Sequence, residues 1–154
     1  MLCACGKNDI GEPASLSHIF PAKQAELLEG QCSRPSPGPI DGAWEPSESM
    51  VIEIVDDLKS LLQEEIDKYN IAFEPHNRAT DAAASDYSFQ IFGLVIEGEK
   101  IIYVNGMHTQ LLGLSRNGDI SEYFSVCDGG SGFFGVEYLI SDEKFRNFHF
   151  NFTV

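Results

Sequence analysis

The chain has 154 residues, of which 43% are hydrophobic and eleven are phenylalanine, so it is long and apolar enough to fold as one domain around its own core. Its formal net charge of −14 at pH 7 opposes binding to phosphate backbones, so nucleic acid is not an expected partner. No apolar run approaches the roughly 18–20 residues that a membrane-spanning helix needs, which leaves an N-terminal lipid as the expected tie to a membrane.

The first residues resemble the end of a bacterial lipoprotein signal. A lipobox consists of an aliphatic residue, two small residues and the cysteine that becomes lipidated, and Leu2-Cys3-Ala4-Cys5 follows this order. The basic and apolar segments that come before a lipobox are not part of the sequence. We therefore expect a lipid on Cys5 and a periplasmic, membrane-anchored protein, or a cytoplasmic one if Met1 is the true start.

A proline-rich segment precedes the first regular helix. Four prolines lie within residues 35–46, where they exclude a regular helix and favour extended geometry. We expect residues 32–46 to form an extended strap on the domain, with Trp44 as its anchor at the edge of the core.

One long amphipathic helix follows. Ser47 can cap its first turn, and Asn70 is a suitable stop. Apolar residues at three- and four-residue spacing form one stripe, which comprises Val51, Val55, Leu58, Leu62, Ile66 and Tyr69. The opposite face is acidic and carries Glu53, Asp56, Asp57, Glu64, Glu65 and Asp67 with only two lysines.

The pattern then changes to a period of two residues, which is typical of strands. Strands are predicted over residues 87–96, 100–105, 120–127, 133–140 and in the last segment, where Phe148, Phe150 and Phe152 share one face. The predicted fold is α+β, with the helix packed on a four-stranded antiparallel sheet, in an element order like that of cystatin- and NTF2-type folds.

The domain division follows from these elements. Residues 1–31 are predicted to be a lipobox-like start and tether, with one short helical turn around residues 22–28. Residues 32–154 are predicted to form the single α+β domain.

The N-terminal cysteines allow a second interpretation. Cys3 and Cys5, followed by Ser17-His18-Ile19-Phe20-Pro21, resemble the opening of some HNH-type nucleases. A zinc site needs two cysteine pairs, usually with two residues between the members of a pair, and this chain has one residue between them and no second pair. The acidic charge also opposes DNA binding, so the nuclease interpretation is the weaker one.

The remaining polar residues do not form a catalytic pattern. His18, His76, His108 and His149 are far apart in sequence and lack the spacing of metal ligands. We therefore predict no catalytic group, no metal site and no cofactor.

If Cys5 carries the lipid, Cys3 leaves with the signal, and Cys32 and Cys127 remain. Two cysteines in a periplasmic protein normally pair, so we predict a disulfide between them. A nucleophilic role for Cys127 would require a nearby cation or helix N-terminus, and its neighbours Asp128 and Gly129 provide neither.

The segment Asp128-Gly129-Gly130-Ser131-Gly132 is followed by a strand and not by a helix, so it is not a phosphate-binding loop. We predict a hairpin connection there, which could also protrude as a recognition loop with Phe133 at its side.

Three segments resemble a protein group. These are Cys32-Ser33-Arg34-Pro35, Ile101-Ile102-Tyr103-Val104-Asn105, and Val126-Cys127-Asp128-Gly129-Gly130 with the following aromatic strand. Together they resemble small, uncharacterised exported or lipoprotein-type proteins of Gram-negative bacteria over about residues 32–152. The resemblance implies export and a shared fold, and it implies no active site.

The leading functional hypothesis is a non-enzymatic binding protein of the envelope, such as an inhibitor or immunity-type partner of a basic hydrolase. An acidic surface attracts basic partners and speeds their association. The alternative is that these carboxylates only keep the protein soluble. The predicted partner-binding residues are Asp56, Asp57, Glu64 and Glu65 on the helix and Asp128, Gly129, Gly130, Ser131 and Phe133 in the loop.

The alternative is a ligand-binding or hydrolytic domain on the concave face of the sheet, with a cavity lined by Phe89, Phe92, Tyr103, Tyr123 and Tyr138. A purely structural envelope protein is a third hypothesis, and the oligomeric state is not predicted.

Overall fold

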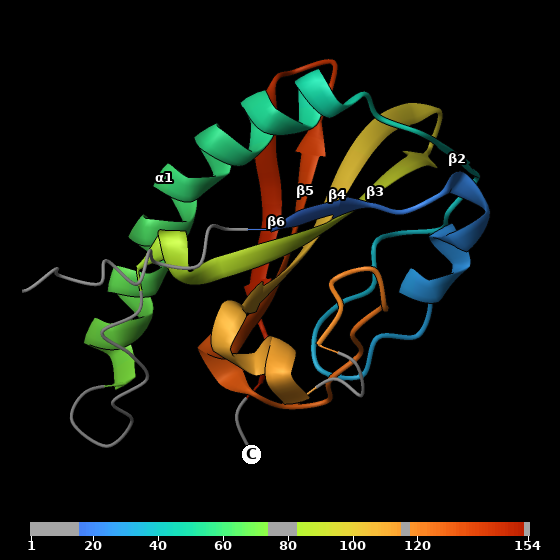
Figure 1. Ribbon diagram of the computed structural model, residues 1–154. Coiled ribbons are helices and arrows are strands. Elements are labelled where there is room, and N and C mark those ends of the chain that lie inside the picture. The colour runs from blue at the N-terminus through green and yellow to red at the C-terminus, as the bar shows by residue number, and fades with distance from the viewer. Residues whose placement is uncertain (1–15, 74–82, 115–117, 153–154) are drawn as a thin grey trace, which may run out of the picture.

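The structure is a computed structural model that describes residues 16–73, 83–114 and 118–152 (Figure 1). Its elements in chain order are β1 (Ser17–Ile19), the 3-10 helix η1 (Ala22–Leu28), β2 (Gly42–Trp44), α1 (Glu48–Phe73), η2 (Ala84–Asp86), β3 (Tyr87–Ile96), β4 (Glu99–His108), η3 (Thr109–Leu114), η4 (Gly130–Gly132), β5 (Phe133–Leu139) and β6 (Lys144–Phe150). The predicted α+β class, with one long helix beside a sheet, is confirmed.

The sheet has six strands in the described part of the chain and is mixed. Strands β3, β4, β5 and β6 follow one another as antiparallel neighbours. Both short strands pair with the other edge of β3: β1 runs parallel to it and β2 antiparallel. The predicted four-stranded antiparallel sheet is therefore corrected to a six-stranded mixed sheet, because segments that were expected to lie outside the sheet extend it.

The strand predicted over residues 120–127 is absent, and β5 pairs directly with β4. The apolar residues of this segment pack against one face of the sheet, where Ile120, Phe124 and Val126 contact a small cluster around Met107 and Phe133. Alternating apolar residues can result from packing on a sheet as well as from pairing within one, which is why the pattern was misleading.

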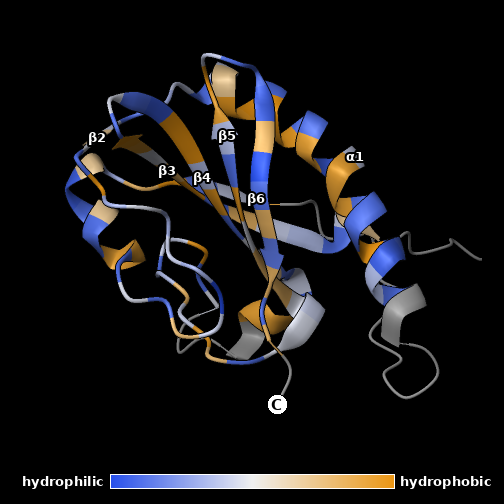
Figure 2. Ribbon diagram, turned by 180° about the vertical axis from the view of Figure 1, so that it is seen from behind, coloured by the Kyte–Doolittle hydropathy of each residue, from blue (hydrophilic) through white to orange (hydrophobic). Residues whose placement is uncertain are grey.

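Helix α1 begins where the sequence predicts. The Oγ atom of Ser47 accepts a hydrogen bond from the backbone N–H of Met50 at 3.3 Å, which caps the first turn. The helix continues past the predicted stop at Asn70 to Phe73. Its buried stripe consists of Val51, Ile54, Val55, Leu58, Leu62 and Ile66. Figure 2 shows hydrophobic and hydrophilic residues alternating along the turns of this helix.

The two faces of the sheet are covered differently. On one face, α1 packs against side chains that include Phe89, Ile91, Val104 and Phe134. On the other face, the segment containing β1 and η1 packs against Phe92 and its neighbours in a second apolar cluster. The sheet is thus the middle layer of the domain.

The segment predicted to be a tether belongs to the domain over its described residues, 16–31. Phe20 is 2% exposed and Leu28 is fully buried, and β1 is hydrogen-bonded to β3. The short helical turn predicted around residues 22–28 is present as η1. Cys3 and Cys5 lie outside the described residues.

Trp44 is half-buried at the edge of the core, as predicted. Its Nε1–H donates to the carbonyl oxygen of Leu94 at 3.0 Å, and the Lys100 ammonium lies 5.0 Å from the centre of its ring. Within the described residues, no helix has the length and apolar character needed to cross a membrane.

Candidate functional site

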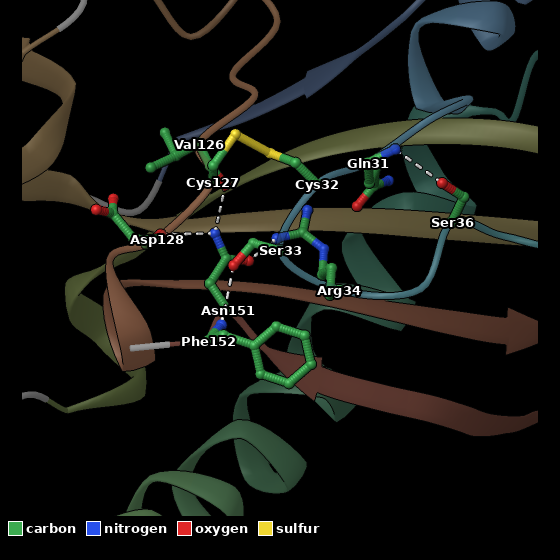
Figure 3. Close-up of a disulfide and its surroundings, with 10 residues drawn as sticks. All are labelled: Gln31, Cys32, Ser33, Arg34, Ser36, Val126, Cys127, Asp128, Asn151 and Phe152. Carbon is green, nitrogen blue, oxygen red and sulfur yellow. Dashed lines mark hydrogen bonds between the residues drawn. A yellow bond between two sulfur atoms is a disulfide. The ribbon is translucent and has the colours of Figure 1, made fainter. Parts of the chain in front are cut away.

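The disulfide fixes one end of the proline-rich segment. The sulfur atoms of Cys32 and Cys127 are bonded, with their Cα atoms 5.1 Å apart, and the two residues are separated by 95 positions in sequence (Figure 3). The pairing predicted from the sequence is therefore present. Both cysteines are exposed, so the bond lies at the surface.

The two residues after Cys32 turn inward. Ser33 is 2% exposed, and its backbone and side-chain oxygens both accept from the N–H of Phe152. Arg34 is 8% exposed and donates from Nε to the Tyr103 hydroxyl at 3.1 Å, from Nη1 to Asn151 Oδ1 and from Nη2 to Asn105 Oδ1. All three acceptors are neutral.

A glycine makes room for this guanidinium. Asn105 on β4 pairs with Gly135 on β5, and a Cβ atom at Gly135 would lie 2.6 Å from Arg34 Nε. Any larger residue at this position would displace Arg34 or Tyr103.

Polar residues form a row across the sheet at this level. Asn105 pairs with Gln90 on β3, which pairs in turn with His18 on β1, while Gly135 pairs with His149 on β6. Directly paired residues in neighbouring strands share a face. The row therefore lies on the face away from α1, between two apolar clusters.

The amides of this network hold the irregular segment that precedes the disulfide. Gln90 Nε2 donates to the carbonyl oxygens of Ile120 and Glu122 at 2.9 and 2.6 Å. Asn105 Nδ2 donates to the carbonyl of Phe124 at 3.2 Å, and Asn151 Nδ2 donates to two carbonyls near Cys127 at 2.9 Å. Side-chain donors thus replace the ladder bonds that a strand over residues 120–127 would have provided.

A cleft of about 200 Å³ lies beside Arg34 on this face. Its lining consists of Arg34, Pro35, Ser36, Gly38, Tyr103, Gly135, Glu137, Asn147 and His149. Glu137 is 4% exposed, and its Oε2 atom accepts from Arg146 Nε at 2.7 Å and from Asn147 Nδ2 at 3.1 Å. Asn147 has a left-handed φ of 54° beside an irregularity in the pairing of β5 with β6. The cleft therefore presents a buried cation and a buried carboxylate to the same space.

Burial keeps two tyrosines neutral, Tyr123 on the face of the cleft and Tyr87 on the face packed against α1. Burial raises the pKa of Tyr123 to about 12, although the charge of Arg34 acts in the opposite direction. Burial also raises the pKa of Tyr87, whose hydroxyl donates to the carbonyl of Ser131 at 2.5 Å. Among the described residues, no group of three or more histidine, cysteine or acidic side chains could hold a metal ion.

The predicted partner-binding carboxylates of α1 lie on its outer face. Asp56, Asp57 and Glu64 are exposed, whereas Glu65 is half-buried and pairs with Lys68 Nζ at 2.7 Å. Asp56 lies 3.6 Å from Lys59 Nζ. The structure brings these four residues together on one helix.

The predicted recognition loop is largely buried. Asp128 and Gly129 are exposed, but Gly130 and Ser131 are buried and form part of η4. Phe133 is 7% exposed and packs with Met107 and Leu112, on the face of the sheet opposite α1. Phe133 is therefore not available as an aromatic anchor, and the loop does not extend the acidic surface of the helix.

The five aromatic residues predicted to line one concave cavity do not share a cavity. Phe89 and Tyr138 pack with α1, whereas Phe92 lies on the other face and stacks on Phe20 with ring centres 4.5 Å apart. Of the five aromatic residues proposed to line it, Tyr103 lines the 200 Å³ cleft, and Tyr123 lines a second hollow of about 10 Å³ on the other side of Arg34.

The polar network beside the cleft was not identified from the sequence. Gln90 and Asn105 interrupt otherwise apolar strands, and Arg34 sits among prolines beside a cysteine. A polar residue in the middle of each of two adjacent apolar strands was the available signal, because buried polar groups require partners.

Comparisons of the chain with protein-family models, with curated protein sequences and with solved structures find no match.

Proposed function

We propose that this chain is a non-enzymatic binding protein of the cell envelope, and that the outer face of α1 binds a basic protein in the manner of an inhibitor or immunity-type protein. The observation that carries the proposal is the charge of this face. It bears six carboxylates, and its two lysines are each paired within the helix.

An apolar side chain lies within this acidic face. Ile52 is 63% exposed, one helical turn after Glu48 and one turn before Asp56. Protein interfaces combine a central apolar anchor with a charged rim, and the rim charges act mainly on the rate of association. Ile52 therefore provides an anchor that the predicted loop, with its buried Phe133, does not.

The envelope location rests on three features. The lipobox-like start would place a lipid on Cys5, and disulfides such as Cys32–Cys127 persist in oxidising compartments such as the periplasm. The likeness of residues 32–152 to exported proteins of Gram-negative bacteria supports the same location.

The packing of the sheet favours a protein partner over the ligand-binding or hydrolytic alternative on a concave sheet face. The aromatic residues expected to line one concave cavity lie on both faces of the sheet and are mostly buried in the core, and only Tyr103 among them lines the 200 Å³ cleft. A protein-binding surface on the helix needs no such cavity.

The test is the association rate with basic hydrolases at increasing salt. Candidates come from a pull-down with native envelope, and kinetics are then measured with each purified protein. We expect the rate to fall as salt rises, because exposed charges are screened beyond about 8–10 Å at physiological ionic strength. Neutralising Asp56, Asp57, Glu64 and Glu65 to their amides should lower it in the same way.

A matched control carries the same change in net charge away from the helix. Glu26, Glu29, Glu97 and Glu99 are exposed, and their replacement by glutamine should leave the association rate nearly unchanged. Kinetics that are insensitive to salt and to the helix substitutions would contradict the proposal and leave solubility as the role of these carboxylates.

A further inference from the structure

We infer that the 200 Å³ cleft beside Arg34 binds a small zwitterionic amino acid, with its carboxylate towards Arg34 and Tyr103 and its ammonium towards Glu137. This inference goes beyond the proposed protein-binding function, because the cleft lies on the face of the sheet opposite α1.

The first step concerns the charge of Arg34. A buried cation is costly unless it is paired, and no ion pair in the described part of the chain includes Arg34. Its three hydrogen bonds go to neutral oxygens of Tyr103, Asn105 and Asn151. An anionic group in the adjoining cleft would compensate this charge.

Tyr103 provides a donor for that anion. Its oxygen accepts from Arg34 Nε at 3.1 Å, so its own O–H is the group left to donate. That hydroxyl now lies 3.3 Å from Gln31 Oε1, which is long for an O–H···O bond. A ligand carboxylate in the cleft would be a stronger acceptor, because charged acceptors form shorter bonds.

The second step concerns Glu137. It is 4% exposed, and both of its hydrogen bonds are accepted by Oε2. Among the described residues, no donor bonds to Oε1, and this oxygen is not enclosed, so a donor in the cleft can reach it. An ammonium group is such a donor, and it would add to the Arg146 guanidinium that already pairs with this carboxylate.

The size of the cleft limits the occupant. Drug-sized ligands occupy pockets of about 300–1,000 Å³. The volume of about 200 Å³ lies below this range and suits a molecule of a few heavy atoms. A small amino acid combines that size with one carboxylate and one ammonium.

The experiment is a titration of the folded protein with L-alanine, followed by amide NMR shifts and calorimetry. Propionate and ethylamine serve as probes that each lack one of the two charged groups. We expect saturable binding of alanine, and binding of each single-charge probe weaker by about tenfold or more. Absence of alanine binding at millimolar concentration, or equal binding of propionate and alanine, would overturn the inference.

A pair of substitutions on β6 tests the location. His149→Trp should fill the cleft from an exposed strand position and abolish alanine binding. Lys144→Trp adds the same ring to an exposed position of the same strand outside the cleft, and it should leave binding intact. Equal loss, or equal retention, in both variants would place the ligand elsewhere.

Glu137→Gln tests the charge assignment separately. It removes the partner of the ammonium and should bring alanine and propionate to similar affinities. Retained preference for alanine would contradict the role of Glu137. None of these variants changes the outer face of α1, so their failure is distinguishable from failure of the proposed protein-binding function.

Discussion

The two faces of the sheet are buried by different kinds of structure. One face is covered by a single helix, and the residues between them form one apolar cluster. The other is covered by irregular segments, and there a polar band of Gln90, Asn105 and Arg34 separates two smaller apolar clusters. A helix satisfies its own backbone groups, so it requires only apolar side chains beneath it. A segment without regular secondary structure leaves backbone carbonyl groups without hydrogen-bond donors. The side chains of the polar band donate hydrogen bonds to these carbonyls.

The largest effect is expected from the disulfide that closes the irregular face. Replacing Cys32 and Cys127 together by serine should lower the free energy of unfolding by about 4–5 kcal/mol, because a loop of this length is freed in the unfolded chain. Urea unfolding measures the loss, and the wild-type protein under reducing conditions should match the double variant. A loss below about 1 kcal/mol would show that the bond does little to hold this face.

A core substitution on the helical face should cost somewhat less. Leu58 is fully buried, and Leu58→Ala is expected to cost about 3 kcal/mol through lost burial and a residual cavity. Ile52→Ala on the exposed side of the same helix is the control and should stay within about 0.5 kcal/mol. Similar losses in both variants would mean that the helix is not packed as described.

A substitution in the polar band should destabilise mainly the segment that the band holds. Asn105→Ala removes an acceptor from Arg34 and a donor from the carbonyl of Phe124, and it should cost about 2 kcal/mol. Hydrogen exchange should become faster mainly around residues 118–128. Val104→Ala, at the adjacent position facing α1, should destabilise the domain without this selective effect. Equal exchange in the two variants would refute the division between the faces.

The smallest effect concerns alkaline pH. Because burial raises the pKa of Tyr123 to about 12, its folded form keeps the phenolic proton after the unfolded chain has lost it above about pH 10. The folded state then binds more protons, so the free energy of unfolding falls as pH rises from about 10 to 12, and it is unaffected below that window. Tyr123→Phe should reduce the slope of this fall in urea unfolding measured at several pH values. An unchanged slope would mean that other groups cause it.

The same contrast explains what the sequence could predict. The helix, its cap at Ser47 and its apolar stripe were predicted correctly. These features depend on residues close together in sequence, namely a regular apolar repeat and a capping residue. The disulfide followed from the small number of cysteines. The segment 120–127 was predicted incorrectly, because alternation does not distinguish pairing within a sheet from packing on it. Phe133 was predicted correctly to begin a strand, but the sequence did not show that its side chain is buried.

The cleft was not predictable from sequence patterns. Arg34, Tyr103, Glu137 and His149 come from the proline-rich segment and three strands, and their meeting depends on the register of those strands. The parallel pairing of β1 was missed for a similar reason. A three-residue strand has too short a pattern to recognise, and its partner β3 follows the long helix in sequence.

The irregular face has a consequence for the order of folding. Arg34 is synthesised early, yet its partner Asn151 follows 117 positions later, and Cys127 follows Cys32 by 95. Such a high contact order slows folding, since long loops must close before these contacts form. We expect α1 and the β3–β4 hairpin to assemble first and the proline-rich segment to dock last. During refolding from the reduced state, a pulse of thiol-reactive label should therefore continue to modify Cys32 until the final strand has joined the sheet.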